Sequence, residues 1–416
     1  MAADTVKVSM YNVGFGDCFL LRFPSADRER KVLIDCGSIK QGAAGATDVI
    51  VRQIIEDLSA EGPPQLDVVA MSHRHKDHVS GFANESWSEV AVGEVWLPWI
   101  ENPSDDRARQ ILQEMAGFAL SLQKEMKALK AMGRFSAAEQ ELIDHVISNT
   151  LALSNERALN TLHRGFKGGT SSPRQFLSRS ASPLVTNALP GVTVHVLGPS
   201  KEEVVIRDMN PPSKESFLRA AAGLDAGEPG DLLPFPISSE FPNEPSDALK
   251  DFLRRIADES ALLGAVALEG AVNNTSLMLV FEVGDAVLFF PGDSQWGSWK
   301  VNMDDPLRRQ LLERTTFYKI GHHGSHNSTP VTFAHDILNN TGIPGAKIWA
   351  AASVTPHGKF GEIPKKELLT ELGTRIAQPK QVIRSDEPPA SNSAPAGLKV
   401  HKRNGKPIRF DFEVAV

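Results

Sequence analysis

Residues 70–82 read AMSHRHKDHVSGF, and this stretch decides what kind of chain this is. Three histidines and one aspartate fall within six positions, at His73, His75, Asp77 and His78. Imidazole and carboxylate groups together suit Zn²⁺ and its first-row neighbours. Four donors so close along a chain rarely converge on one ion, so we expect them to divide between two ions roughly 3.5–4 Å apart. Such a site needs more ligands from distant segments, among them a bridging carboxylate.

Further donors follow apolar runs that are typical of buried strands. KVLIDCG contains Asp35, and VLFFPGDS contains Asp293. FYKIGHHGSH contains His322 and His323 after a third apolar run. Open α/β sheets bind their ligands beyond the carboxyl ends of strands. We therefore expect these side chains to meet the first cluster.

The order of the predicted elements is that of an α/β fold. The first forty residues predict strands, residues 47–60 predict an amphipathic helix, and residues 89–99 predict another strand region. A second strand-rich block begins at residue 273. The two blocks are candidates for two similar halves of one fold.

Two segments differ from this α/β pattern. Residues 101–165 are rich in Ala, Leu, Glu and Lys and predict two or three inserted helices. Residues 201–270 hold many prolines and predict a long surface excursion. We expect a single domain over residues 1–416 that carries these two insertions.

Several motifs resemble those of the metallo-β-lactamase superfamily. More narrowly, they are similar to its ComEC-like metallo-hydrolase group, which includes the nuclease domain of a bacterial DNA-uptake protein and its soluble relatives. Besides HRHKDH, the resemblance rests on NVGFGD (12–17), NNTSLML (273–279) and YKIGHHGS (318–325). It spans about residues 5–100 and 191–410. It implies a four-layer αββα sandwich.

The resemblance also implies a role for most of the donors. His73 and His75 would bind the first ion. Asp77 and His78 would bind the second, and Asp293 would bridge the two. The superfamily's usual third histidine on the first ion is missing, because Gly198-Pro199 stands where it is expected.

Other roles implied by the resemblance concern the second ion and its surroundings. One of His322 and His323 would complete that ion's ligand set, with His323 favoured. Asp35 would orient the loop and a ligand. The expected chemistry, rather than the resemblance, makes Lys319, Ser325, His326 and His357 candidates for contacting a phosphate or protonating a leaving group. We take Asp77, Asp35 and Lys319 as catalytic candidates. The expected cofactors are two divalent ions, Zn²⁺ first, with Mn²⁺ left open by the incomplete first site.

The implied activity is that of a metal-dependent hydrolase. A hydroxide bridging two divalent ions is a nucleophile near neutral pH, because metal binding lowers the pKa of water to about 7. We expect a phosphodiesterase or nuclease first, with nucleic acid contacting the basic stretch 157–201, which contains no Asp or Glu. One alternative is a hydrolase of small esters, lactones, phosphocholine esters or β-lactams. Another is a partner-binding or sensing subunit that uses the helical insertion as its interface.

Composition limits the remaining choices. The formal net charge of −7 excludes a polycationic nucleic-acid-binding protein, although it leaves room for a local basic patch. Only two cysteines are present, Cys18 and Cys36, which suits a reducing compartment. The most apolar stretch, residues 276–290, is broken by Glu282 and Asp285. We expect a cytoplasmic protein without a membrane partner, and the oligomeric state stays open.

Overall fold

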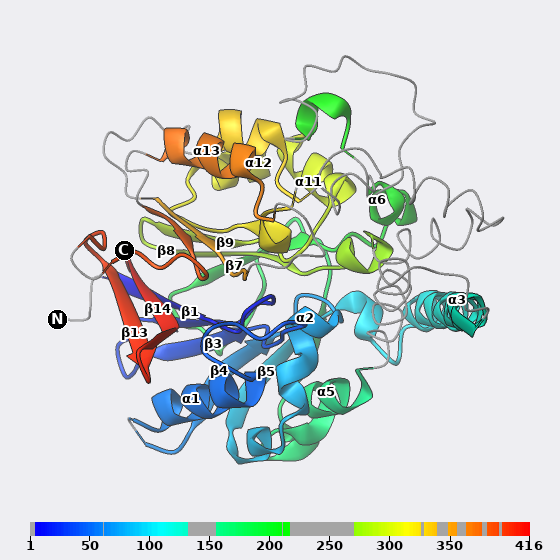
Figure 1. Ribbon diagram of the computed structural model, residues 1–416, viewed down its shortest axis with the longest axis horizontal. Coiled ribbons are helices and arrows are strands. Elements are labelled where there is room, and N and C mark those ends of the chain that lie inside the picture. Colours follow the sequence, from blue (N-terminus) through cyan, green and yellow to red (C-terminus); the bar gives the residue numbers. More distant parts are fainter. Residues whose placement is uncertain are drawn as a thin grey trace.

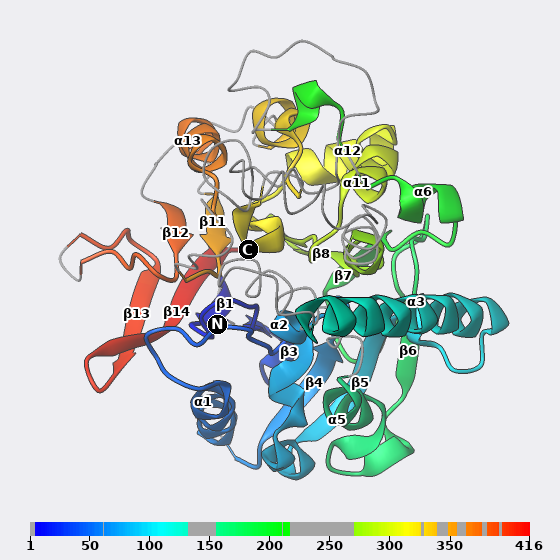
Figure 2. The same cartoon turned by 45° about the vertical axis from the view of Figure 1, so that its right-hand side comes forward.

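Two mixed β-sheets face each other in the computed structural model, and helices cover the outer face of each (Figures 1 and 2). The structure describes residues 5–60, 62–131, 155–209, 211–216, 270–325, 328–338, 348–355, 363–376, 381–390 and 393–416. The middle of the expected helical insertion and most of the expected proline-rich insertion lie outside these residues.

The larger sheet has eight strands, and its spatial order differs from the chain order because the C-terminal hairpin pairs with the first strand. Its strands are antiparallel from β13 to β3 and parallel from β3 to β6. In spatial order they are β13 (Leu398–Arg403), β14 (Lys406–Ala415), β1 (Thr5–Tyr11), β2 (Phe19–Phe23), β3 (Arg30–Ile34), β4 (Gln65–Ala70), β5 (Ala91–Pro98) and β6 (Arg174–Leu177).

The smaller sheet has six strands and repeats the same change from antiparallel to parallel pairing. In spatial order they are β12 (Val382–Arg384), β11 (Trp349–Ala352), β10 (Phe317–Lys319), β9 (Ala286–Phe290), β8 (Met278–Val283) and β7 (Thr193–Gly198). In each sheet a hairpin (β2–β3 or β8–β9) is followed by parallel strands that are added on one side. This shared order agrees with the expectation of two similar halves.

Helices connect the parallel strands, and single short turns fill several loops. The helices are α1 (Thr47–Ser59), α2 (Lys76–Val79), α3 (Asp106–Ala131), α5 (Glu156–Asn160), α6 (Glu203–Arg207), α11 (Trp296–Met303), α12 (Pro306–Glu313) and α13 (Lys366–Arg375). The short turns are η1 (Ser80–Ala83), η2 (Glu85–Glu89), η3 (Trp99–Glu101), η5 (Thr161–Gly165), η6 (Gly169–Ser171), η7 (Ser213–Glu215), η8 (Gly321–Gly324) and η9 (Phe333–Ile337).

Apolar side chains divide the molecule into four layers. Strand residues such as Val68 and Leu288 meet in a core between the two sheets. The helix predicted over residues 47–60 is α1, and its apolar stripe packs on the outer face of the larger sheet. Helices α11, α12 and α13 cover the outer face of the smaller sheet (Figure 1). These contacts give the layer order helix, sheet, sheet, helix. The expected α/β class is therefore confirmed by the packing of the two sheets and their helices.

The described part of the helical insertion consists mainly of α3, a helix of 26 residues. Its first turns pack against η3 and α6 through Ala108, Trp99 and Ile206. Among the described residues, no helix combines the length and apolar character needed to cross a membrane.

Candidate metal centre

The HRHKDH motif spans the loop after β4 and the first residues of α2, and two other loops are hydrogen-bonded to it. The backbone N–H of Asp17 donates to the carbonyl of Asp77 at 2.9 Å, and that of Cys36 donates to the carbonyl of His78 at 2.8 Å. These bonds tie the loops after β1 and β3 to the motif. The backbone that carries the side chains of Asp77 and His78 is therefore held in place by hydrogen bonds.

Gly37 allows this close approach of the loops. A Cβ at Gly37 would lie 2.5 Å from the Asp77 carbonyl carbon and 2.6 Å from the His78 nitrogen, both of which are backbone atoms that cannot rotate away. We expect Gly37→Ala to lower the free energy of unfolding by about 2 kcal/mol or more, since overpacking must move the chain, and to weaken metal binding. Gly117→Ala in α3 is the matched control, because a Cβ there meets nothing within 4 Å. Equal thermal unfolding of the two variants would contradict this account.

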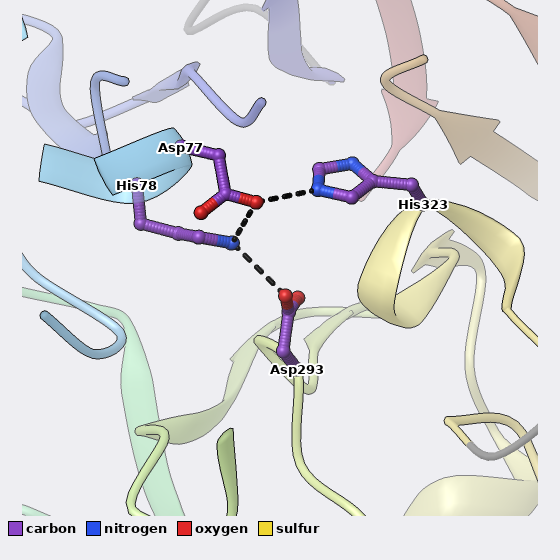
Figure 3. A group of neighbouring side chains, drawn as sticks. All are labelled: Asp77, His78, Asp293 and His323. Carbon is purple, nitrogen blue, oxygen red and sulfur yellow. Dashed lines mark hydrogen bonds and ion pairs between the residues drawn. The ribbon is translucent and has the colours of Figure 1, made fainter. Parts of the chain in front are cut away.

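Four buried donors from three separate segments converge beside the motif. Asp77 and His78 come from α2, Asp293 follows β9, and His323 lies in η8 after β10. One ligand atom from each lies within 4.8 Å of the others. Figure 3 shows Asp77 between the imidazoles of His78 and His323, with Asp293 facing His78 from the opposite sheet. Loops that follow the carboxyl ends of strands in both sheets thus supply the side chains of this one group.

The spacing of these donors suits a metal ion. The Asp77 Oδ2 atom is 3.0 Å from His323 Nε2 and 3.7 Å from His78 Nε2. His78 Nε2 is also 3.0 Å from Asp293 Oδ2. Ligand atoms bound to zinc at about 2.0–2.1 Å in a tetrahedron lie roughly 3.3 Å apart. The donor set and its spacing therefore fit a divalent cation.

His73 and His75 form a neighbouring pair of imidazoles. His73 Nε2 and His75 Nδ1 are 3.0 Å apart, and His73 Nε2 lies 4.0 Å from Asp293 Oδ2. Burial lowers the pKa of His73 well below its ordinary value and that of His75 to about 4. Both rings are therefore neutral near pH 7, and their lone pairs are available to a cation. Within the four-residue group, the Asp293 carboxylate is near both this pair and His78.

Asp35 lies behind His78 and does not belong to the four-residue group. Its Oδ2 atom accepts from Ser72 Oγ at 2.6 Å and lies 2.8 Å from His78 Nδ1, which leaves His78 Nε2 facing the other donors. Asp35 has a left-handed backbone with φ of 55°, and the Ser72 N–H donates to its Oδ1 at 2.7 Å. Hydrogen bonds of this kind orient metal-binding imidazoles. The expected orienting role of Asp35 has these contacts in its support.

The structure distinguishes His323 from its neighbour His322. His323 is buried, and its Nδ1 donates to the Ser353 carbonyl at 2.8 Å, which points Nε2 toward Asp77. The His322 ring is only partly buried and contacts Ser325 Oγ, while its backbone N–H donates to Asp293 Oδ1 at 3.1 Å. Of the two, only His323 joins the four-residue group.

Mutual electrostatics sets the protonation of the four-residue group. Burial alone disfavours a charged imidazole, yet the carboxylates of Asp293, Asp77 and Asp35 raise the pKa of His78 well above its ordinary value. Burial likewise opposes a charged His323, whose pKa is nevertheless raised, first by the hydrogen bond that its Nε2 donates to the Asp77 carboxylate. Burial opposes ionisation of Asp293, but His78 and Lys319 hold its pKa well below the usual range. A divalent cation would take the place of protons here.

Lys319 is buried at the base of this group, with a side chain only 2 % exposed. Its ammonium pairs with Asp17, lies 3.4 Å from Asp293 Oδ1 and donates to the Gly292 carbonyl at 3.3 Å. Asp17 is equally buried. The residues around Asp17 in the sequence do not indicate an ion pair with residue 319.

The position of the missing third histidine stays without a histidine ligand in the described structure. Gly198 ends β7, and His195 on the same strand pairs with Glu282 of β8 at 3.1 Å, away from the metal-binding group. His326 and His357, two other histidines considered for substrate contact, lie outside the described residues.

A buried ion pair holds the motif from its other side. Arg74, between His73 and His75, makes two hydrogen bonds to Glu101 of η3, at 2.8 and 2.6 Å. We expect Glu101→Ala to lower the free energy of unfolding by about 3 kcal/mol, because it leaves a buried guanidinium unpaired. Glu85→Ala is the matched control, since Glu85 pairs with Arg157 at the surface. If urea unfolding gave both variants the same stability, the Arg74–Glu101 pair would not support the motif.

The basic stretch 157–201 makes many contacts within the chain. Arg174 donates to the carbonyls of Gly169 and Ser172, and Arg179 donates to that of Val301. Arg157 and Lys201 each pair with a carboxylate. Contact of this stretch with nucleic acid stays a prediction.

Comparison with known proteins adds no family to this description: no protein-family model matches the chain, and no curated protein matches it.

Proposed function

We propose that the chain is a metal-dependent hydrolase of the metallo-β-lactamase fold, close to the ComEC-like group, and that it cleaves phosphodiesters. The observation that carries the proposal is the convergence of Asp77, His78, Asp293 and His323 beside the His73–His75 pair. Burying several carboxylates and imidazoles together costs free energy unless they are paired or bind a cation, so simple packing does not account for this set. The four layers and the repeated hairpin-plus-parallel order support the fold assignment.

The charge of the site supports two cations. Within the described structure, four carboxylates lie around the group, from Asp17, Asp35, Asp77 and Asp293, and one ammonium, from Lys319. This leaves an excess of negative charge that one divalent ion would not balance. In the metal-free protein, protonated imidazoles supply part of the compensation.

The chain's own residues would divide the work as follows. His73 and His75 would hold one cation, and Asp77, His78 and His323 the other, with Asp293 facing both sets. When bound, the two cations supply Lewis acidity that lowers the pKa of water and stabilises charge on a phosphoryl oxygen. Asp35 and the Ser353 carbonyl orient the imidazoles of His78 and His323.

A substrate panel tests the proposal. The protein is stripped with EDTA and assayed with Zn²⁺ or Mn²⁺ against bis-p-nitrophenyl phosphate, plasmid DNA, RNA and nitrocefin. We expect phosphodiester hydrolysis that disappears on chelation and returns with added metal. His75→Ala is expected to lose this activity, whereas His195→Gln, which changes a histidine outside the group, keeps it. Turnover that survives complete chelation would overturn the metal assignment.

The second candidate is hydrolysis of small esters, lactones, phosphocholine esters or β-lactams. The internal pairing of Arg157, Arg174 and Arg179 favours it, because these cations already have partners. The net charge of −7 also disfavours attraction of a polyanion. Hydrolysis of nitrocefin or a small ester, with both nucleic acids and bis-p-nitrophenyl phosphate untouched, would select this candidate.

A further inference from the structure

The NVGFGD loop (12–17) is the sequence motif that the proposed function leaves without a task. It lies beneath the second cation's ligands: the Phe15 ring centroid is 4.3 Å from that of His323, and Asp17 pairs with Lys319. Gly14 takes a left-handed backbone with φ of 94°, and a Cβ there would strike the backbone of residues 40–42. The loop therefore contacts the site through Phe15 and Asp17, while Gly14 allows it to pack closely on residues 40–42.

The two oxygens of Asp293 face different surroundings. Oδ2 lies 3.0 Å from His78 Nε2 and 4.0 Å from His73 Nε2, on the side of the ligands. Oδ1 lies 3.4 Å from Lys319 Nζ and accepts from the His322 backbone N–H at 3.1 Å. Two groups therefore fix the Oδ1 side of this carboxylate, the His322 N–H and the Lys319 ammonium, and the second depends on what holds Lys319.

Lys319 is held from below by Asp17. Besides Asp17 and Asp293 Oδ1, the ammonium contacts the Gly292 carbonyl, one position before Asp293. The Asp17 Oδ1 atom has no hydrogen-bond partner among the described residues. The Lys319 ammonium is the nearest cationic group to this buried carboxylate, and His78 Nδ1 and His323 Nδ1 lie farther away, at 3.8 and 3.7 Å. A phosphate contact would require Lys319 to leave all three oxygens while remaining buried.

We infer that Asp17 is a positioning residue that holds the Lys319 ammonium against Asp293 Oδ1 and so directs Asp293 Oδ2 toward the cations. This inference rests on the proposed metal centre. Asp17 and Lys319 act as one unit: neither touches the ligand imidazoles through a hydrogen bond, and both act through the orientation of Asp293. This role for Lys319 is an alternative to the expectation that it contacts the substrate.

A competing account treats Lys319 only as a positive charge near the cations. The two accounts predict opposite signs for Lys319→Met. Removing a repelling ammonium would strengthen divalent binding. Losing the contact that orients Asp293 would weaken it, by about tenfold or more, as for other groups that orient metal ligands.

The test is a double-mutant cycle on metal binding without substrate. Zn²⁺ affinity is measured by competition with a chromophoric chelator for Asp17→Asn, Lys319→Met and the double variant, with unfolding of the metal-free proteins followed alongside. We expect each single variant to bind about tenfold more weakly or worse, and the double variant to lose much less than the product of the two losses. Lys300→Met is the control, because Lys300 pairs with Asp304 at the surface, and its affinity should not change.

Tighter binding by Lys319→Met, or losses that simply multiply, would overturn the inference. If Lys319→Met does not fold, the isosteric Asp17→Asn decides alone, and unchanged affinity in that folded variant overturns it. A wild-type protein that binds Zn²⁺ and shows the expected cycle but cleaves no phosphodiester would contradict the proposed function and leave this inference standing.

Discussion

Asp293→Ala is expected to reduce phosphodiester turnover by about a thousandfold or more, because metal stabilisation of a transition state is worth several kcal/mol and each 1.4 kcal/mol is about tenfold. Asp293 Oδ2 lies near both His78 and His73. Its removal therefore takes a donor from both candidate ligand sets. It also leaves the Lys319 ammonium with Asp17 as its sole carboxylate partner in the described structure.

The measurement is the initial rate with bis-p-nitrophenyl phosphate at saturating Zn²⁺ or Mn²⁺, together with metal content per chain. Asp293→Asn keeps the shape of the side chain and separates loss of a ligand from loss of packing. Asp285→Ala is the matched control, since Asp285 lies exposed in the turn between β8 and β9. A folded Asp293→Ala variant with more than a tenth of the wild-type rate would remove Asp293 from the centre of the mechanism.

The positions of the candidate metal ligands were predictable because each follows a strand in the sequence. Asp293 comes directly after an apolar strand, and the HRHKDH cluster follows another. Parallel strands bring such residues to one edge of a sheet, and sequence shows both the strand and the polar residue after it. Asp35 was predicted in the same way, because it directly follows strand β3. From that position it contacts Ser72 and His78.

What could not be predicted depends on contacts between segments far apart in the chain. The pairing of Asp17 with Lys319 joins residues 302 positions apart, and neither residue's neighbours in sequence indicate the other. Contacts made by backbone groups are harder still to predict from sequence. The Ser353 carbonyl orients His323, but every residue type carries a carbonyl, so the identity of residue 353 does not indicate this role. The internal contacts of the basic stretch 157–201 were likewise not predictable. Its many basic residues and lack of acidic ones suggested a loop free to bind phosphate, whereas Arg174 and Arg179 donate to carbonyls of the chain itself.

The choice between His322 and His323 needed backbone dihedral angles. His322 has φ of 44° and His323 has φ of 54°, a left-handed conformation that is uncommon for residues other than glycine. The turn directs the first ring toward Ser325 and the second toward Asp77. Strained backbone of this kind clusters at functional sites, where the surrounding structure maintains it.

His323→Ala and His322→Ala form a matched pair that tests this division. We expect His323→Ala to lose about one of two bound cations per chain and to lose roughly a hundredfold or more in rate, since it removes an imidazole that faces Asp77. His322→Ala should keep both cations and lose no more than about tenfold, because the contact of residue 322 with Asp293 comes from its backbone N–H.

Replacing a histidine in a strained turn could lower activity by disturbing the backbone rather than by removing a ligand, and comparing these two variants separates the two effects. Alanine retains the left-handed strain at either position, so both variants carry a comparable backbone cost and differ in the side chain removed. Metal content by mass spectrometry then reports on ligation, independently of any substrate. Equal loss of metal in both variants would mean that the turn, and not the His323 imidazole, holds the cation. Loss in His322→Ala alone would reverse the assignment and place His322 among the ligands.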